Sequence, residues 1–333
     1  MDQTTSTFKT EIEDIVSFIK FKADVIKGLS AFPKHLDSKY FYDVVGDRLF
    51  QEIMRCPEYY PTKCELEILA GQTHKIITDF LNYAGDEFDL IELGAGDALK
   101  SSYLLKELLH HNFNFGYYSI DISENVIELL TKQLPVKFPG LSLTGLQGDY
   151  FDMLRKANKL SDKRKIVLFL GANIGNMLPN QAVQFCRQLR ENMTEGDLLF
   201  IGFDLKKDPQ IILDAYNDKQ GLTRDFNLNL LKRINQELGG DFDLNQFQHY
   251  PMYDPETGSC KSFLISKCKQ KVIFRGEKDQ RFNFEEGEYI NMETSQKYTI
   301  DEINTMANSS GFNSLHKYTD SKNWFIDALW IAE

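Results

Sequence analysis

The chain of 333 residues is 42% apolar and 26% charged, with 38 basic residues against 49 acidic ones and a net charge of −11. This composition is typical of a globular protein and excludes the disordered and fibrous classes. No run approaches the roughly 18 consecutive apolar residues of a membrane span, and the polar segment Met1–Ile12 is unlike a secretory signal. Because the negative charge opposes binding to phosphates, we expect no nucleic acid as partner. Without an apolar run of that length we also expect no membrane as partner, and we expect a cytoplasmic protein. We also expect a monomer.

The cysteines and histidines lack the spacing of a disulfide framework or a metal site. The five cysteines are odd in number and contain no CxxC pair, and the six histidines show no ligand spacing. His110 and His111 end a predicted helix, where exposed imidazoles are common. We expect no metal and a reducing compartment.

Three segments are predicted before the first strand. Apolar residues recur at three- and four-residue spacing over Thr7–Leu29, which predicts an amphipathic helix. The segment Ala31–Thr62 is rich in aromatic residues and bounded by prolines, and we expect it to form a cap. A second helix is predicted from Glu65 to about Asn82.

Strands then alternate with helices of ten to fifteen residues. The predicted strands are Phe88–Ile91, Tyr117–Ile120, Leu141–Leu146, Ile166–Leu170 and Leu198–Phe203. The predicted helices between them are Leu99–His110, Asn125–Gln133 and Gln181–Asn192. This alternation predicts an α/β fold with a doubly wound, mostly parallel sheet.

After Asp204 the alternation stops. Pro209–Gly239 is predicted to be helical, and short β-like runs follow at Ser262–Ser266, Lys271–Phe274 and Arg281–Phe284, so we expect an inserted second lobe of α+β structure. The helix Thr299–Ser310 and the strands Leu315–Tyr318 and Trp324–Ile331 would return the chain to the first sheet. The predicted division is 1–64 for the N-terminal helix and cap, 65–205 with 299–333 for the core, and 206–298 for the lobe.

The first predicted strand ends in the glycine turn Gly94-Ala95-Gly96-Asp97. At a strand-to-helix turn, glycines let the backbone and its amide donors approach a bound nucleotide. The dinucleotide fingerprint requires a third glycine three residues later, but that position is Leu99. The turn therefore favours a nucleoside over a nicotinamide dinucleotide.

Acidic residues follow the next two strands. Asp121 lies at a strand end, where it can accept hydrogen bonds from both ribose hydroxyls, and Asp149 beside Tyr150 can bind an adenine amino group and cover its ring. Each acid alone would equally suit a helix N-cap. The three strand ends together favour S-adenosylmethionine as cofactor.

The fourth strand runs into Gly171-Ala172-Asn173-Ile174-Gly175-Asn176. The carboxyl edge of an open α/β sheet is where ligands bind, and an amide there can orient a substrate. Asn and Gly also favour tight turns for purely structural reasons.

These motifs resemble the L-histidine Nα-methyltransferases of ergothioneine biosynthesis, and the resemblance extends over roughly Leu29 to Leu329. Beyond the strand ends, the resemblance rests on the following motifs: Lys39-Tyr40-Phe41-Tyr42-Asp43, Pro57-Glu58-Tyr59-Tyr60-Pro61-Thr62, Asp204-Leu205-Lys206-Lys207-Asp208, Ala215-Tyr216, Phe226-Asn227, Asp241-Phe242-Asp243, Phe247-Gln248-His249 and Glu293-Thr294-Ser295-Gln296-Lys297-Tyr298. It implies a class I S-adenosylmethionine-dependent methyltransferase core with a Rossmann-like fold and a smaller substrate-binding lobe.

The resemblance also implies roles for individual residues. The cofactor site would contain Gly94, Lys100, Asp121, Asp149 and Tyr150. An amino-acid substrate would be held by Tyr59, Asn176, Tyr216, Glu293 and Ser295, with Tyr42, Phe50 and Gly171 near the reacting amine.

Physical chemistry agrees with these roles in kind. Asn176 and Tyr216 can donate hydrogen bonds to a carboxylate. Glu293 and Ser295 lie two residues apart, so on a strand they share one face, where the carboxylate can accept an imidazole N–H. Without the resemblance, the same pair would suit a solvated strand face.

Two departures from the family pattern are present. The first turn has Gly-Ala-Gly-Asp where the family usually has Gly-Ser-Gly-Thr, and Ser262 stands where family members have a methionine against the substrate side chain. The second departure leaves the identity of that side chain open.

The predicted reaction is transfer of methyl groups from S-adenosylmethionine to the α-amino nitrogen of L-histidine, up to the trimethylated betaine hercynine. Tyr42, or a water that it positions, could accept the proton of the amine, and Asn176 would fix the substrate beside it. The alternatives are the same chemistry on tryptophan or tyrosine, and a non-catalytic protein that binds S-adenosylmethionine.

Overall fold

The computed structural model describes residues 3–275 and 279–333, and the chain forms two compact units. Unit 1 contains the residues up to Glu58, then Pro209–Asp254 and Cys260–Thr294. Unit 2 contains Tyr59–Asp208, Pro255–Ser259 and Ser295–Glu333. The N-terminal segment thus clusters with the inserted segment, and the functional division into cap, core and lobe stays a prediction.

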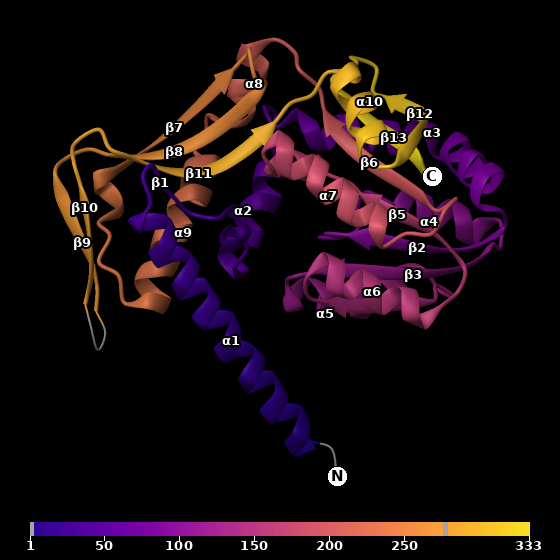
Figure 1. Ribbon diagram of the computed structural model, residues 1–333, viewed down its shortest axis with the longest axis horizontal. Helices are drawn as coiled ribbons and strands as arrows, with labels where there is room; N and C mark the ends of the chain where they lie inside the picture. Colours follow the sequence, from indigo (N-terminus) through magenta and orange to yellow (C-terminus); the bar gives the residue numbers. More distant parts are fainter. Residues whose placement is uncertain (1–2, 276–278) are drawn as a thin grey trace. The chain divides into compact units, whose positions relative to one another are not determined.

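Unit 2 is built on a seven-stranded sheet with the strand order β12-β13-β6-β5-β2-β3-β4 (Figure 1). Its strands are β2 (Glu87–Leu93), β3 (Asn114–Asp121), β4 (Leu143–Gln147), β5 (Arg164–Phe169), β6 (Leu198–Asp204), β12 (Phe312–Thr319) and β13 (Phe325–Ala332). The strands from β4 to β6 are parallel, whereas β13 is antiparallel to β6 and β12 is antiparallel to β13. The predicted doubly wound, mostly parallel sheet and the return of the last two strands to it are confirmed.

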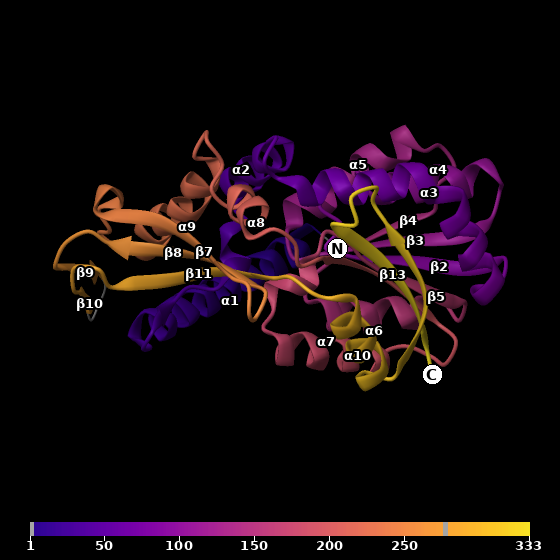
Figure 2. The same cartoon turned by 90° about the horizontal axis from the view of Figure 1, so that it is seen from above.

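Helices cover both faces of this sheet, as Figure 2 shows. One face is covered by α3 (Tyr60–Ala84), α4 (Ser101–His110) and α5 (Glu124–Lys137), and the other by α6 (Tyr150–Leu160), α7 (Pro179–Glu191) and α10 (Ile300–Ser309). Because the central strands are covered on both faces, they are nearly continuous apolar runs, and all seven residues of β6 are buried. Helix α6 was not predicted from the sequence.

The strand order reverses direction at β2, which has β3 on one side and β5 on the other. At such a switch point the connections leave β2 and β5 in opposite directions, so a crevice opens beyond the carboxyl ends of these strands. The glycine turn after β2 and the Gly171–Asn176 turn after β5 both lie at this edge.

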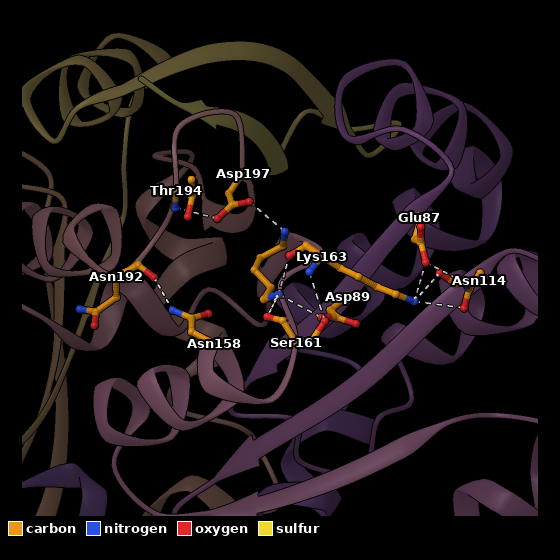
Figure 3. A network of polar contacts seen from close by, with 10 residues as sticks. Glu87, Asp89, Asn114, Asn158, Ser161, Lys163, Asn192, Thr194 and Asp197 are labelled. Carbon is orange, nitrogen blue, oxygen red and sulfur yellow. Dashed lines mark hydrogen bonds and ion pairs between the residues drawn. The ribbon is translucent and has the colours of Figure 1, made fainter.

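A polar network ties the opposite, amino-terminal ends of the strands together (Figure 3). Lys165 Nζ donates to Asp89 Oδ2 at 3.0 Å, and both side chains are buried. Asp197 accepts from the backbone N–H of Lys165 at 2.9 Å and of Thr194 at 2.7 Å. These bonds join β2 and β5 to the turn before β6.

Unit 1 contains helices, a four-stranded sheet and a hairpin. The sheet has the order β1-β11-β8-β7, and β9 pairs with β10 in an antiparallel hairpin. The elements are α1 (Gln3–Ser30), β1 (Lys34–His35), η1 (Ser38–Phe41), α2 (Val44–Arg55), α8 (Pro209–Ala215), α9 (Leu222–Leu238), η3 (Leu244–Gln246), β7 (Phe247–Asp254), β8 (Ser259–Ser266), β9 (Gln270–Phe274), β10 (Gln280–Phe284) and β11 (Tyr289–Gln296).

The predicted N-terminal helix, the helical segment after Pro209 and the three β-like runs are confirmed, whereas α2, β1, β7 and β11 were not predicted. No helix within 3–275 or 279–333 is both long and apolar enough to cross a membrane.

Candidate active site

The glycine turn after β2 is shaped by two close neighbours. Gly94 has a φ of +73°, and a Cβ placed on it would lie 2.8 Å from Tyr150 Oη and 3.3 Å from Asn173 Nδ2. A side chain is therefore excluded on both conformational and steric grounds. The structure brings the predicted residues Gly94 and Tyr150 together, and it adds Asn173, which the sequence analysis did not assign.

Asp121 connects the end of β3 to the same turn. Its Oδ2 accepts from the backbone N–H of Gly96 at 3.3 Å, and its Oδ1 accepts from the N–H of Ser123 at 2.9 Å. The side chain that caps α5 is Ser123, which accepts from Val126 N. Burial raises the pKa of Asp121. Asp121 is thus not a helix N-cap and stays a candidate acceptor for ribose hydroxyls.

Asp149, in contrast, is the N-cap of α6. Its Oδ1 accepts from the backbone N–H of Phe151 at 3.0 Å and of Asp152 at 3.4 Å. The neighbouring ring of Tyr150 packs edge-on against Phe169 at 5.9 Å between centroids, and burial raises the pKa of its hydroxyl. Asp149 therefore fixes the start of the helix that presents Tyr150.

Lys100 lies at the switch point itself. Its Nζ is 2.6 Å from Glu65 Oε2, and Glu65 Oε1 accepts from the backbone N–H of Gly171 at 2.7 Å. A Cβ placed on Gly171 would lie 2.9 Å from Lys100 Nζ. Lys100 and Gly171, predicted for different parts of the site, are therefore neighbours.

Glu65 was missed by the sequence analysis. It is fully buried on α3, where it shares a helical stripe with the buried residues Ile68, Leu69 and Ile76. A glutamate in an apolar stripe of three- and four-residue spacing is the sequence signal that could have identified it.

The Asn176 turn lies beside Ser295. Asn173–Asn176 form a short 3₁₀ helix after Gly171 and Ala172, which both have positive φ, of +81° and +55°. A Cβ placed on Gly175 would lie 2.8 Å from the carbonyl oxygen of Gln296 and 3.7 Å from Ser295 Oγ. Two predicted substrate residues, Asn176 and Ser295, are thus carried by backbone segments in contact.

A buried charge network holds Ser295. Lys297 Nζ donates to Ser295 Oγ at 2.8 Å and lies 2.7 Å from Asp204 Oδ2. Lys207 also pairs with Asp204, and Tyr60 Oη donates to Asp204 Oδ2 at 2.8 Å. Burial would raise the pKa of Asp204, but the two ammonium groups outweigh it and hold that pKa below its usual value.

This network explains three of the motifs noted in the sequence, because it joins the Tyr60, Asp204–Lys207 and Ser295–Lys297 segments. Tyr59, predicted to bind substrate, is the N-cap residue of α3 directly before Tyr60.

The other predicted residues belong to unit 1. Tyr42 and Phe50 pack edge-on at 5.7 Å between ring centroids, and each ring is 5.8 Å from that of Phe226. Asp43 caps α2 through Gly46 N and accepts from Asn229 Nδ2 on α9 at 2.9 Å. The aromatic cluster is therefore fixed between α2 and α9.

Tyr216, Ser262 and Glu293 occupy three separate elements of unit 1. Tyr216 is buried directly after α8, and Glu293 is half-buried on β11. Ser262 is 1% exposed on β8, and its Oγ has no hydrogen-bond partner among the described residues. A buried hydroxyl in this state is a candidate for contact with a ligand or water.

One group of side chains has the chemistry of metal ligands. His74 Nδ1 and His111 Nε2 lie 3.2 Å and 3.4 Å from Glu107 Oε1, on α3 and at the end of α4. The side chains of His74 and His111 are 84% and 45% exposed, and His74 Nδ1 is hydrogen-bonded to Glu107 Oε1. The expectation that the protein holds no metal stays a prediction.

Unit 2 combines a doubly wound sheet, a glycine turn into which Tyr150 projects, and an acid at the next strand end. These features define the class I S-adenosylmethionine-dependent methyltransferases, whose fold is Rossmann-like. Residues 21–332 match the family of histidine-specific, S-adenosylmethionine-dependent methyltransferases. The chain belongs to this family, and its cofactor is S-adenosylmethionine.

Three relatives illustrate the range of the family. The histidine N-alpha-methyltransferase of Mycolicibacterium smegmatis is 32% identical over 90% of this chain and 91% of the relative. Ergothioneine biosynthesis protein 1 of Neurospora crassa is 29% identical over 89% of this chain and 33% of that longer protein. The L-tryptophan methyltransferase of Psilocybe serbica is 28% identical over 93% of this chain and 92% of the relative.

Proposed function

We propose that the protein methylates the α-amino nitrogen of L-histidine, up to the trimethylated betaine hercynine, as a step of ergothioneine biosynthesis. The observation that supports this most is the match to the histidine-specific family over residues 21–332, which includes both compact units. The relatives from Mycolicibacterium and Neurospora support the same substrate through their names.

The residues of unit 2 would hold the cofactor. The glycine cradle at Gly94 and the acid Asp121 suit a nucleoside, and Lys100 suits the carboxylate of the methionine part. S-adenosylmethionine, when bound, supplies an activated methyl group on a sulfonium. The protein's task is then to align a neutral amine behind that methyl carbon, and near-attack geometry supplies several kcal/mol, up to about 7–11.

The substrate residues would divide the amino acid between them. Asn176 and Tyr216 would hold the α-carboxylate and amine, while Glu293 and Ser295 would bind the imidazole. Tyr42, Phe50 and Tyr59 would surround the amine, because ring faces attract the cationic methylated products. Tyr42, or a water that it orients, would accept the proton that each amine loses before attack.

The test is a panel of twenty amino acids incubated with the purified protein and S-adenosylmethionine carrying a labelled methyl group. We expect label in histidine, with mono-, di- and trimethylated products separated by mass. Label in another amino acid and none in histidine would reject the proposed substrate, and label in none of the twenty would favour a non-catalytic protein.

The second candidate is the same reaction on tryptophan or tyrosine. It is favoured by Ser262, a small buried residue where the family resemblance implies a methionine, and by the tryptophan methyltransferase among the relatives. Removal of about two to three heavy atoms from a pocket wall creates space that a larger ring can fill. The same panel distinguishes this candidate from the first.

We further propose that the protein works as a cytoplasmic monomer without a nucleic-acid partner. The net charge of −11 supports the last point. Light scattering after size-exclusion chromatography tests the oligomeric state, and a mass near twice the 38.5 kDa of one chain would reject the monomer.

A further inference from the structure

Three carboxyl groups are buried beneath the switch point of the unit 2 sheet. Glu65 and Asp327 are 0% exposed and Glu92 is 3% exposed, on α3, β13 and β2 respectively. The ammonium group of Lys100 forms an ion pair with Glu65, and it partly offsets the rise that burial causes in the pKa values of Glu92 and Asp327. A buried carboxylate costs folding free energy unless it is paired, so this arrangement calls for an explanation.

The two oxygens of Glu65 have different partners. Oε2 lies 2.6 Å from Lys100 Nζ, and Oε1 accepts from the backbone N–H of Gly171 at 2.7 Å. Lys100 precedes α4, after the β2 turn, whereas Gly171 begins the turn after β5. One side chain on α3 therefore joins the two turns that border the crevice.

Two residues of adjacent strands lie near the Glu65 carboxylate: Gly202, which leaves space for it, and Asp327, whose pKa it affects. A Cβ placed on Gly202 of β6 would lie 2.7 Å from Glu65 Oε1, so only glycine leaves space for the carboxylate. Asp327 pairs with Gly202 across β13 and β6. Burial and the nearby charge of Glu65 raise the pKa of Asp327 well above its usual value.

We propose that Glu65 is a positioning residue, which fixes the ammonium of Lys100 beside Gly171 so that it receives the carboxylate of the cofactor's methionine part. The side chain of Lys100 is 19% exposed, whereas that of Glu65 is fully buried, so the lysine and not the glutamate faces the ligand. The inference rests on the proposed cofactor site and adds to it a residue that does not touch the cofactor.

Two effects of Glu65 on a bound carboxylate oppose each other. Its negative charge repels the ligand, while its ion pair with Lys100 and its hydrogen bond from the Gly171 amide hold these groups in place. Glu65→Asp separates these effects, because it keeps the charge but withdraws the oxygens by one methylene. Glutamine would serve less well as a probe, since it has one acceptor oxygen for two donors.

The experiment compares two ligands by calorimetry. S-adenosylhomocysteine has the amino-acid part of the cofactor, whereas 5′-methylthioadenosine keeps the nucleoside and the thioether but lacks that part. We expect Glu65→Asp to weaken binding of S-adenosylhomocysteine at least tenfold and to change binding of 5′-methylthioadenosine less than twofold.

Asp89→Asn is the matched control. Asp89 and Lys165 form a second buried carboxylate–lysine pair in the same sheet, at 3.0 Å, but at the amino ends of the strands (Figure 3). We expect this variant to lower the melting temperature and to leave both dissociation constants within twofold.

Other outcomes overturn the proposal. Equal weakening of both ligands by Glu65→Asp would assign it a general structural role, and unchanged or tighter binding of S-adenosylhomocysteine would reject positioning. If Glu65→Asp does not fold by circular dichroism, Gly202→Ala decides in the same way, because its methyl group displaces the carboxylate with all charges kept.

The native chain and Lys100→Gln separate this inference from the proposed function. A native chain that does not bind S-adenosylhomocysteine would reject the proposed function and the inference together. Native-like binding by Lys100→Gln would reject the place of Lys100 in the site. If only the Glu65 prediction fails, the proposed function and the place of Lys100 in the cofactor site both stand.

Discussion

Asp121 is the last residue of β3 and Asp149 follows the end of β4, and the chain uses the two acids differently. Asp149 satisfies the first amides of α6, whereas Asp121 leaves the capping of α5 to Ser123 and bonds to the glycine turn. An acid that is not required by a helix is the better candidate for a ligand. Asp121 therefore has the stronger claim to the cofactor's ribose.

We predict that Asp121→Ala weakens cofactor binding about 10- to 150-fold, because loss of a charged hydrogen-bond acceptor costs about 1.5–3 kcal/mol. Calorimetry with S-adenosylhomocysteine measures the change. Asp152→Ala, at an exposed acid on α6, is the control and should bind as the native protein does. Unchanged affinity in Asp121→Ala would remove this residue from the site.

Asn176→Ala should weaken every amino-acid substrate by a similar factor, about tenfold, because the amide would hold the part common to all of them. The KM values for histidine and for the next best substrate of the panel provide the comparison. A loss confined to one substrate would assign Asn176 to the side chain instead.

Glu293 and Ser262 should determine the choice of side chain. A site built to bind an N–H discriminates strongly, because the acceptor is otherwise left unpaired. We predict that Glu293→Ala reduces kcat/KM for histidine more than any other substitution in unit 1, by at least 100-fold. Ser262→Met should be neutral or favourable for histidine.

Competition assays with histidine, tryptophan and tyrosine test the predictions for Glu293 and Ser262. If tryptophan or tyrosine is preferred by the native enzyme, or if Ser262→Met selectively destroys histidine turnover, the choice of histidine is wrong while the methyltransferase assignment stands.

The sequence identified those site residues that belong to short motifs at the ends of strands. A glycine turn and an acid after a strand are visible in the chain, and Gly94, Tyr150 and the Gly96–Asp121 pair do meet in the structure. Glu65 could not be placed in this way, because Lys100 and Gly171 lie far along the chain, and the same holds for the pairing of Lys297 with Asp204. Only the packing of α3 against the sheet brings Glu65 to Gly171.

At the scale of elements, segments with a clear apolar pattern were predicted well and segments without one were not. The parallel strands stand out because they are buried on both faces, and so does α3 with its apolar stripe. Helix α6 was missed because its few buried residues, Leu154 and Ala157, are separated by charged ones. β7 was missed because alternate residues are only partly buried.

Helix α10 offers a test of one element. Thr299 accepts from the N–H of Glu302 at 3.2 Å, and Glu302 Oε2 accepts from Thr299 N at 2.7 Å, which forms a capping box. Thr299→Ala should reduce the free energy of unfolding by about 1 kcal/mol, measured with urea. Thr299→Ser keeps the hydroxyl and should stay within about 0.5 kcal/mol of native. Equal losses in both would show that the cap is not the cause.

At the scale of the whole molecule, the buried acids make stability depend on pH. Burial raises the pKa of Glu92 from 4.5 to about 7, although Ser101 and Tyr117 donate to it. An acid whose pKa is higher in the folded state than in the unfolded state contributes its full stabilisation below the pKa of the unfolded state. This contribution is lost as the pH rises to the pKa of the folded state. The loss falls between about pH 4.5 and 7.

We predict that Glu92→Gln, which cannot ionise, gains about 2–3 kcal/mol relative to the native protein between pH 5 and pH 8, at 1.36 kcal/mol per pKa unit. Urea unfolding of both proteins at the two pH values gives the difference. A difference that does not change with pH would mean that Glu92 ionises normally in the folded protein.

The position of β13 has a consequence for how the chain folds as it leaves the ribosome. β6 is synthesised before the whole of 209–294, yet its neighbour in the sheet, β13, comes last, and the two pair from Phe325↔Asp204 to Ile331↔Leu198. Until then, one edge of a largely apolar strand stays open, which is the kind of surface that aggregates. In the nascent chain, that edge of β6 therefore needs protection until β13 has been synthesised.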